Sequence, residues 1–329
     1  MRGDHAPHYR ATMFFCLRPG RVSPWRLRYS GGSVIRINII GAGRLGKTLA
    51  ALARRSGRYS VQDVMTRNMG SAAAACAFIG MGRPVTEWAD LAAADLYLLA
   101  VPDAAIADCA QRLAAAGVPS GAVVFHASGV SGSGLLRATA ARGAYIGSLH
   151  PAFSFADPAV ALEGFSDVLC ALEGDAEACV ALRALAQAIG GRPFELTNGG
   201  KPAYHAALSV ASNYLVTLTA IARHLAGQGG VPEELITPLL GGLMRQTLEN
   251  ALALGPQAAL TGPIARGDAS TVALHLQAMD DGELRAVYQA LGRQTVALAG
   301  EGLPEPARRQ VLSALAFEEG SEPVQGLAS

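Results

Sequence analysis

In the first two thirds of the chain, short apolar runs alternate with segments of helical periodicity. The runs are rich in β-branched residues and bounded by turn residues, which is typical of buried strands. The predicted strands are 34–40, 61–65, 94–101, 121–126, 144–149, 165–173 and 192–197, with helices that include 104–116 and 175–189. Because continuous apolar strands that alternate with helices form sheets covered on both faces, we expect an α/β domain with a mostly parallel sheet.

Beyond residue 199 the periodicity is helical to the end, with breaks at 227–232, 255–256, 261–263 and 300–304. We therefore expect an α/β domain over 34–198 and an all-helical domain over 199–318. A length of 329 residues, half of them apolar, suits two domains with separate cores.

The first 33 residues show no strand or helix period and are rich in arginine. We expect this extension to be disordered, and the simplest explanation is that the start of the coding sequence is placed too early. A transit peptide would also be rich in arginine, but no clear amphipathic helix is visible. Residues 319–329 are expected to form a flexible tail. No run of 18 apolar residues free of glycine and charge occurs, so we expect a soluble, cytoplasmic protein.

The stretch from Val34 to Ala53 contains a glycine turn between a predicted strand and an alanine-rich helix. In the pattern Gly-x-Gly-x-x-Gly, Gly41 permits a tight turn, Gly43 lets a pyrophosphate approach the backbone and Gly46 lets the helix pack on the strand. Free N–H groups at the helix start hold the anion. The strand, turn and helix predict a Rossmann-like dinucleotide site that includes Arg44 and Leu45.

The end of the second strand indicates which dinucleotide binds. NAD sites place an acidic residue there, whereas NADP sites often supply arginine. Here the strand ends on Thr66 and Arg67, and Asp63 lies two or three residues too early to reach the ribose. We therefore expect NADP; the alternative is that Arg67 is only a solvated loop charge.

Polar residues also follow the later strands, at the sheet edge where such folds bind ligands. We expect Val101, Pro102 and Asp103 to lie near the nicotinamide. We expect Ser128, Gly129 and His150 to bind the substrate, whereas His126 could either take part in the site or simply pack at the end of its strand.

Lys47 and Lys201 are the only lysines, whereas arginine fills every other basic position. A retained lysine can release a proton near neutrality when its pKa is lowered. Lys201, His205, Ser209 and Ser212 fall on one face of a predicted helix, whose positive start would lower the pKa of Lys201. Lys201 is thus a candidate proton donor and His205 its helper; the alternative is an exposed cap and a core histidine.

Residues 255–268 break the helical pattern and then present Arg266, a candidate clamp for a carboxylate. Asp268 is expected to cap the next helix. The segment could equally be a connector with one surface arginine.

Composition excludes several classes of function. A net charge of +1 and only 6% aromatic residues argue against nucleic-acid binding. Five cysteines without C-x-x-C spacing suit buried thiols in a reducing compartment, and no metal site is indicated.

Several motifs together resemble a bacterial family assigned as NADP oxidoreductases, in which a Rossmann-like domain precedes a helical domain of unknown function. The resemblance covers about residues 34–318. It rests on Gly41–Gly46, Val101–Asp103, His126–Gly129, His150–Pro151, Lys201–His205 with Ser212–Asn213, and Thr261–Asp268.

The layout is also similar, more distantly, to the 6-phosphogluconate dehydrogenase superfamily, which includes β-hydroxyacid dehydrogenases, ketopantoate reductase and pyrroline-5-carboxylate reductase. The resemblance implies that Lys201 acts on the substrate and that Ser128–Gly129 binds it. The asparagine that follows the lysine by four residues in β-hydroxyacid dehydrogenases is His205 here, so that role does not carry over. The superfamily also implies a homodimer formed through the helical domain.

We therefore predict an NADP-dependent oxidoreductase that transfers a hydride between nicotinamide and a small, anionic keto, imino or hydroxy acid. Ser128, His150 and Arg266 would hold the substrate, with Gly129, Ser209, Ser212 and Asn213 nearby. The alternative is a non-catalytic NADP-binding redox sensor; a methyltransferase with a similar glycine turn is more remote.

Overall fold

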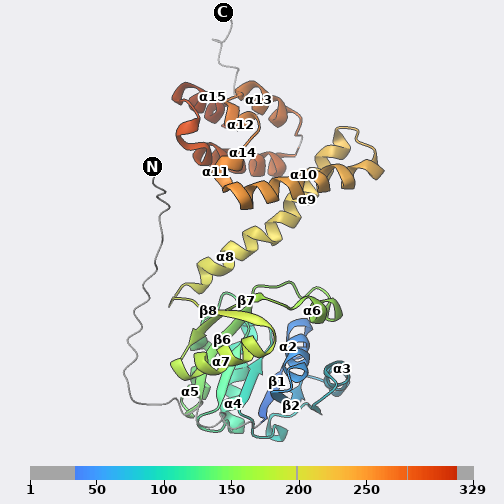
Figure 1. Ribbon diagram of the computed structural model, residues 1–329, viewed down its shortest axis with the longest axis vertical. Coiled ribbons are helices and arrows are strands. Elements are labelled where there is room, and N and C mark those ends of the chain that lie inside the picture. Colours follow the sequence, from blue (N-terminus) through green and yellow to red (C-terminus); the bar gives the residue numbers. More distant parts are fainter. Residues whose placement is uncertain (1–33, 198, 280, 317–329) are drawn as a thin grey trace, which may run out of the picture. The chain divides into compact units, whose positions relative to one another are not determined.

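The computed structural model describes residues 34–197, 199–279 and 281–316, which form two compact units divided between Leu208 and Ser209 (Figure 1). The extension 1–33 and the tail 319–329 lie outside the described residues. Each unit is described separately below.

The first unit is built on a sheet whose strand order is β3-β2-β1-β4-β5-β6-β7-β8. All neighbouring strands pair in parallel except β6 and β7, which are antiparallel. The strands are β1 (Ile35–Ile40), β2 (Tyr59–Met65), β3 (Arg83–Val85), β4 (Leu96–Leu99), β5 (Val123–His126), β6 (Tyr145–Pro151), β7 (Val168–Gly174) and β8 (Gly191–Glu195). The mostly parallel α/β fold is confirmed.

Two features of the sheet differ from the sequence prediction. β3 was not expected, because its three residues are too few to show a period. β7 begins at Val168 rather than at residue 165, and it runs antiparallel to β6. The direction of β7 depends on the strand with which it pairs, and the apolar pattern of a single strand does not indicate that partner.

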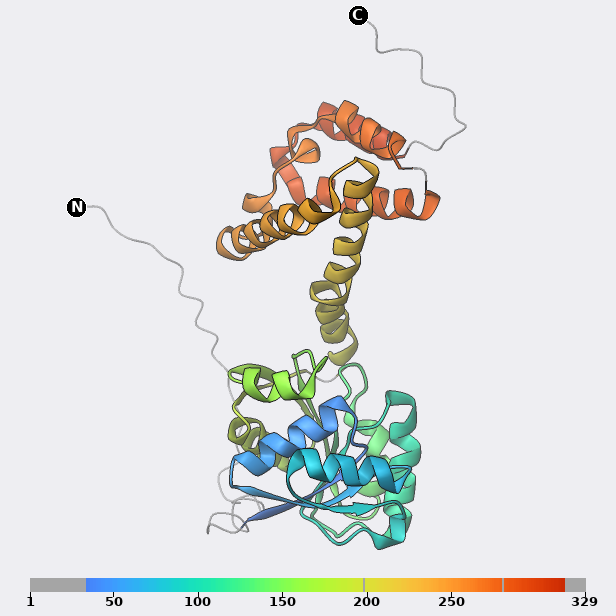
Figure 2. The same cartoon turned by 90° about the vertical axis from the view of Figure 1, so that its right-hand side faces the viewer.

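Alternate residues of the central strands enter two separate cores. Ile37 and Ile39 face one core, whereas Ile40 faces the other. The helices α2 (Arg44–Arg55), α3 (Met69–Ile79), α6 (Pro158–Gly164) and α7 (Ala176–Ala188) pack on the first face. The other face is covered by α4 (Ile106–Ala116) and by η3 (Ser133–Leu136), which continues into α5 (Arg137–Ala140) (Figure 2). Burial on both faces explains why these strands are continuously apolar.

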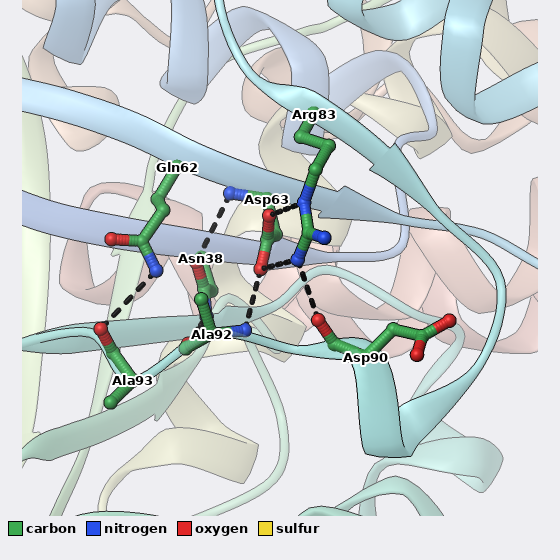
Figure 3. Close-up of polar contacts among 7 residues, drawn as sticks. All are labelled: Asn38, Gln62, Asp63, Arg83, Asp90, Ala92 and Ala93. Atoms are coloured by element: carbon green, nitrogen blue, oxygen red, sulfur yellow. Dashed lines mark hydrogen bonds and ion pairs between the residues drawn. The ribbon is translucent and has the colours of Figure 1, made fainter.

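Asp63 is buried within β2 and ties the first strands to the segment after β3 (Figure 3). Its carboxylate accepts hydrogen bonds from Arg83 Nε at 2.9 Å and from the Ala92 N–H at 2.7 Å. Arg83 also donates to the Asp90 carbonyl at 2.6 Å, and Asn38 donates to the Ala92 carbonyl at 2.7 Å. These bonds hold the segment containing η1 (Trp88–Asp90) against the sheet, and they use the only acidic side chain of β2.

The second unit is helical throughout its described residues, as predicted. Helix α8 (Lys201–Ala211) begins in the first unit. It is followed by α9 (Asn213–Gln228), α10 (Glu233–Leu254), α11 (Pro256–Ala259), α12 (Pro263–Arg266), α13 (Ala269–Gln277), α14 (Gly282–Ala299), η4 (Gly300–Gly302) and α15 (Glu305–Leu315).

The core of this unit lies among α12 to α15, and it includes Ile264, Val272, Val296 and Val311. Asp268 caps α13 as predicted, because its carboxylate accepts the Thr271 N–H at 3.0 Å. By contrast, α9 buries none of its residues.

Candidate functional site

The turn between β1 and α2 has the geometry that its glycines predict. Gly41 has φ of +87°, and a Cβ there would lie 2.5 Å from the Ala100 carbonyl oxygen. A Cβ on Gly46 would collide with the Gly41 carbonyl, so this glycine brings helix and strand together. Gly43 differs, because a Cβ there would meet no atom of the described residues within 4 Å. The turn is therefore closed at Gly41 and Gly46 and open at Gly43.

The start of α2 leaves backbone donors free for an anion. The first hydrogen bond at this end of the helix runs from the Lys47 N–H to the Gly43 carbonyl, so the preceding N–H groups have no partner within the helix. No side chain caps the helix, and its first turn contains no acidic residue. These donors and the positive end of the helix dipole suit a pyrophosphate.

A cavity of about 790 Å³ opens beside this turn, within the first unit. Six of the predicted cofactor residues line it: Gly41, Gly43, Thr66, Arg67, Val101 and Pro102. Arg44, Leu45, Gly46 and Asp103 do not line it. Gly46 is buried in the contact between helix and strand, and Asp103 binds Ser128 instead.

Sequence analysis missed other residues of the cavity wall. Two of them are Asn68, which caps α3, and Ser71, whose N–H donates to the Asn68 side chain at 2.8 Å. An asparagine between a predicted strand and a helix is a common N-cap, so the sequence could have identified this pair. The remaining wall residues reach the cavity only through the fold, and they include Thr86, Glu87, Trp88, Cys109 and Arg112.

Arg67 is the cation at the end of β2, and its side chain is exposed. Among the described residues no acidic side chain forms an ion pair with it, whereas Arg112 pairs with Asp108 at 2.9 Å. Asp63 is only 1% exposed and does not line the cavity. The edge of the cavity at β2 therefore presents a free cation and no carboxylate from β2.

A second cluster of polar residues surrounds Lys201, the first residue of α8. Its side chain is only 3% exposed, so the alternative of an exposed cap is wrong. Its Nζ donates to the Ser128 carbonyl at 2.6 Å and to Ser148 Oγ at 2.8 Å. Burial lowers the pKa of Lys201 to about 8, although Glu173 and Asp103 act in the opposite direction. Desolvation, rather than the helix start that the sequence suggested, is the main cause.

Ser128 and Gly129 follow β5 and connect several members of this cluster. Ser128 Oγ donates to Asp103 Oδ2 at 2.6 Å. A Cβ on Gly129 would lie 2.5 Å from His205 Nδ1 and 2.9 Å from His150 Nε2. Glycine is thus required for the two imidazole rings to approach this backbone.

Three histidines lie in this region, and their surroundings differ. His126 accepts the Ser128 N–H at Nδ1, which leaves Nε2 to donate to the Gly132 carbonyl at 3.1 Å. Burial lowers its pKa to about 4. His126 is therefore a neutral histidine with both ring nitrogens paired, which favours the packing alternative.

His150 and His205 present their rings to each other edge to face, 5.9 Å apart. His150 Nδ1 pairs with the Tyr204 hydroxyl at 3.0 Å, and burial lowers the pKa of His150 to about 4. His205 Nδ1 is buried and finds no hydrogen-bond partner among the described residues. A buried ring nitrogen without a partner can bind a polar ligand atom.

The other predicted substrate residues belong to the second unit. Ser209 lies in α8, Ser212 precedes α9, Asn213 begins α9 and the exposed Arg266 ends α12. Their roles stay predictions.

Sequence analysis also missed Ser148, Glu173 and Tyr204. The glutamate in the otherwise apolar run of β7 was the one available signal.

Two family models match separate parts of the chain. Residues 30–151 match a Rossmann-like domain, and residues 168–295 match a domain of unknown function, DUF2520. No curated protein matches the chain.

Solved structures resemble most of the chain at low identity. Protein BF3122 from Bacteroides fragilis, provisionally named an NADP oxidoreductase, is 23% identical, with a TM-score of 0.66 over 80% of this chain and 98% of that one. Protein TM1727 from Thermotoga maritima is 24% identical, with a TM-score of 0.63 over 80% and 98%. A reductive aminase from Aspergillus terreus, solved with NADPH and ethyl levulinate, is 17% identical, with a TM-score of 0.62 over 85% and 99%. At these identities the likeness establishes the fold.

Proposed function

We propose that the first unit binds NADP(H) and that the protein is an NADP-dependent oxidoreductase. The observation that carries this proposal is the cavity lined by Gly43, the residue that precedes α2, and by Arg67, for which the described residues supply no ion-pair partner. The free N–H groups of α2 would hold the pyrophosphate, and Thr66 and Arg67 would hold the 2′-phosphate of NADP. The similarity to proteins named as NADP oxidoreductases and reductive aminases supports this assignment.

The bound cofactor would supply or accept a hydride, and Lys201 would supply the accompanying proton. A buried ammonium whose pKa is close to neutrality is suited to general acid catalysis. His205 would assist Lys201. Ser128, Gly129 and His150 would bind a small keto, imino or hydroxy acid.

Titrations with NADPH and NADH test the cofactor assignment. Arg67→Ala should weaken NADPH binding by about tenfold or more and leave NADH binding nearly unchanged, because the lost cation would hold the 2′-phosphate, which NADH lacks. Arg58→Ala is the matched control, since this arginine precedes β2 at the end away from the cavity. Equal loss of both cofactors in Arg67→Ala, or no loss of either, would contradict the assignment.

Turnover tests the assignment as an enzyme. NADPH oxidation is measured against a panel of small keto acids, with and without amines, and Lys201→Met should abolish it while NADPH still binds. Turnover in Lys201→Met would remove this residue from the mechanism. Binding of NADPH without oxidation of any candidate would favour the redox sensor.

We also propose that a second copy of the chain covers the apolar surface of α9 and α10. The exposed apolar residues of these helices include Tyr214 and Val216 of α9 and Leu239, Leu243 and Leu252 of α10. Among the described residues, the run Lys201–Gln228, with a mean hydropathy of 1.2, is also long and apolar enough to cross a membrane. The ion pair between Arg223 of α9 and Glu233 of α10 suits contact with protein and water rather than with lipid.

A further inference from the structure

We propose that Ser148 and Glu173 form a proton relay that returns a proton from solvent to Lys201 after each catalytic transfer. The inference rests on the proposed function, in which Lys201 is the proton donor. It adds a path by which the buried amine of Lys201 is protonated again.

The two relay residues lie directly opposite each other on the antiparallel strands β6 and β7. Opposite residues of an antiparallel pair place their side chains on the same face of the sheet. Ser148 Oγ accepts from Lys201 Nζ at 2.8 Å and donates to Glu173 Oε2 at 3.3 Å. One hydroxyl group therefore connects the ammonium to the carboxylate.

Glu173 provides the end of the path nearest to solvent. Lys201 and Ser148 are buried, whereas Glu173 is half-buried and is followed by the exposed Gly174. Ser133 holds its carboxylate in place, donating from its N–H and from its Oγ, each at 2.8 Å. The carboxylate is thus held beside Ser148 on a residue that is only partly buried.

The other charged and titratable groups around Lys201 are less suited to this role. Asp103 is exposed and accepts the Ser128 hydroxyl, but the hydrogen bond between Ser128 and Lys201 uses the Ser128 carbonyl and not this hydroxyl. No chain of hydroxyl groups therefore leads from Asp103 to Lys201 through Ser128. His126 and His150 lie close enough to feel the charge of Lys201, and burial keeps both neutral near pH 7. Among the described residues, no direct bond joins either of them, or His205, to Lys201 Nζ.

The transfer conserves protons and changes no oxidation state. After Lys201 has donated a proton, Glu173 takes one from a hydronium ion of the solvent. An O–H bond of the hydronium ion breaks, the Oε2–H bond of Glu173 forms, and a water molecule is left. Ser148 then gives its hydroxyl proton to the neutral Nζ and receives the proton of Glu173, so one N–H bond forms while one carboxyl O–H bond breaks. Lys201 ends as an ammonium and Glu173 as a carboxylate, as they began.

Hydrogen exchange at Lys201 Nζ tests the relay without a substrate. The chain contains only Lys47 and Lys201, so ¹⁵Nζ-lysine labelling gives two signals, and Lys47→Arg assigns them. Ser148→Ala should slow exchange of the Lys201 ammonium with water by about tenfold or more, because the connecting hydroxyl is removed. Glu173→Gln should slow it similarly, and this variant tests the relay even if Ser148→Ala folds poorly.

Thr139→Val is the matched control. It removes another buried hydroxyl, which bonds the Leu136 carbonyl and has no contact with Lys201, so exchange should stay at the wild-type rate. Wild-type or faster exchange in Ser148→Ala and Glu173→Gln, or equal slowing in Thr139→Val, would overturn the relay. The relay alone fails if exchange is unaffected while Lys201→Met still abolishes turnover; turnover in Lys201→Met removes the donor role itself.

Discussion

Lys201 has a lowered pKa because its ammonium is buried, and this gives the folded protein a specific dependence on pH. Its pKa falls from 10.5 to about 8, so the unfolded chain holds the proton more tightly between these values. Lys201 therefore destabilises the fold most below about pH 8, and this penalty disappears as the pH rises toward 10.5.

We expect the difference in stability between Lys201→Met and the wild type to change with pH in the corresponding direction. Methionine has no such proton, so any advantage of the variant should be largest near pH 7 and shrink steadily toward pH 10. Urea unfolding of both proteins at four pH values measures this difference, and the other titrating groups cancel in the subtraction. A difference that stays constant across the range would show that Lys201 titrates normally.

At the residue scale, sequence alone identifies what depends on local pattern. The glycine turn and Arg67 follow a strand directly, so their positions on the cavity could be predicted. Glu173 could not, because it meets Ser148 only through the antiparallel pairing of β6 and β7. The sequence also did not decide whether Lys201 is buried, because the same residues at a helix start can be exposed or buried, depending on what packs against them.

At the scale of elements, the buried Asp63 links β2 and β3 to the segment that carries Glu87 and Trp88 on the cavity wall. Asp63→Ala leaves the guanidinium of Arg83 and the Ala92 N–H without their acceptor, which should cost about 1–3 kcal/mol of unfolding free energy. It should also weaken NADPH binding, although Asp63 does not line the cavity.

Urea unfolding and NADPH titration of the same variant measure the two effects. Glu163→Ala is the control, because it breaks the exposed pair with Arg55 and should change stability by less than about 0.5 kcal/mol. Unchanged stability in Asp63→Ala would contradict the structural role, and unchanged NADPH affinity would contradict the link to the cavity.

Most elements of the first unit could be predicted, because buried strands and amphipathic helices have distinct periods. The short β3 and the reversed β7 could not. β3 lacks a period, and the direction of β7 depends on its partner strand.

At the scale of the whole molecule, the helical unit leaves many large apolar side chains exposed and outside its own core. Leu239 and Leu243 of α10 are 54% and 61% exposed, and their spacing of four residues places both on one face of this helix. We expect the wild type to sediment as a dimer and the double variant Leu239→Arg/Leu243→Arg to sediment as a monomer, because two buried charges at an interface are costly.

Analytical ultracentrifugation at several concentrations tests this expectation. The helical content of the variant, followed by circular dichroism, should match the wild type, because both leucines are exposed. A wild type that is monomeric throughout, or a double variant that remains dimeric, would contradict the proposed interface.

If a dinucleotide binds against the open side of the glycine turn, a side chain added at Gly43 should block it. Gly43 has φ of −66°, and a Cβ built on it would meet no atom within 4 Å in the part of the chain that the structure describes, so Gly43→Val should leave the fold intact. The added side chain would fill the space needed by the pyrophosphate.

The decisive measurement is a calorimetric titration of wild type and Gly43→Val with NADPH, alongside their thermal unfolding. We expect NADPH to bind the wild type, to bind the variant at least about tenfold more weakly, and the two proteins to unfold at similar temperatures. Undiminished NADPH binding by a folded Gly43→Val protein, or no binding by the wild type, would contradict it.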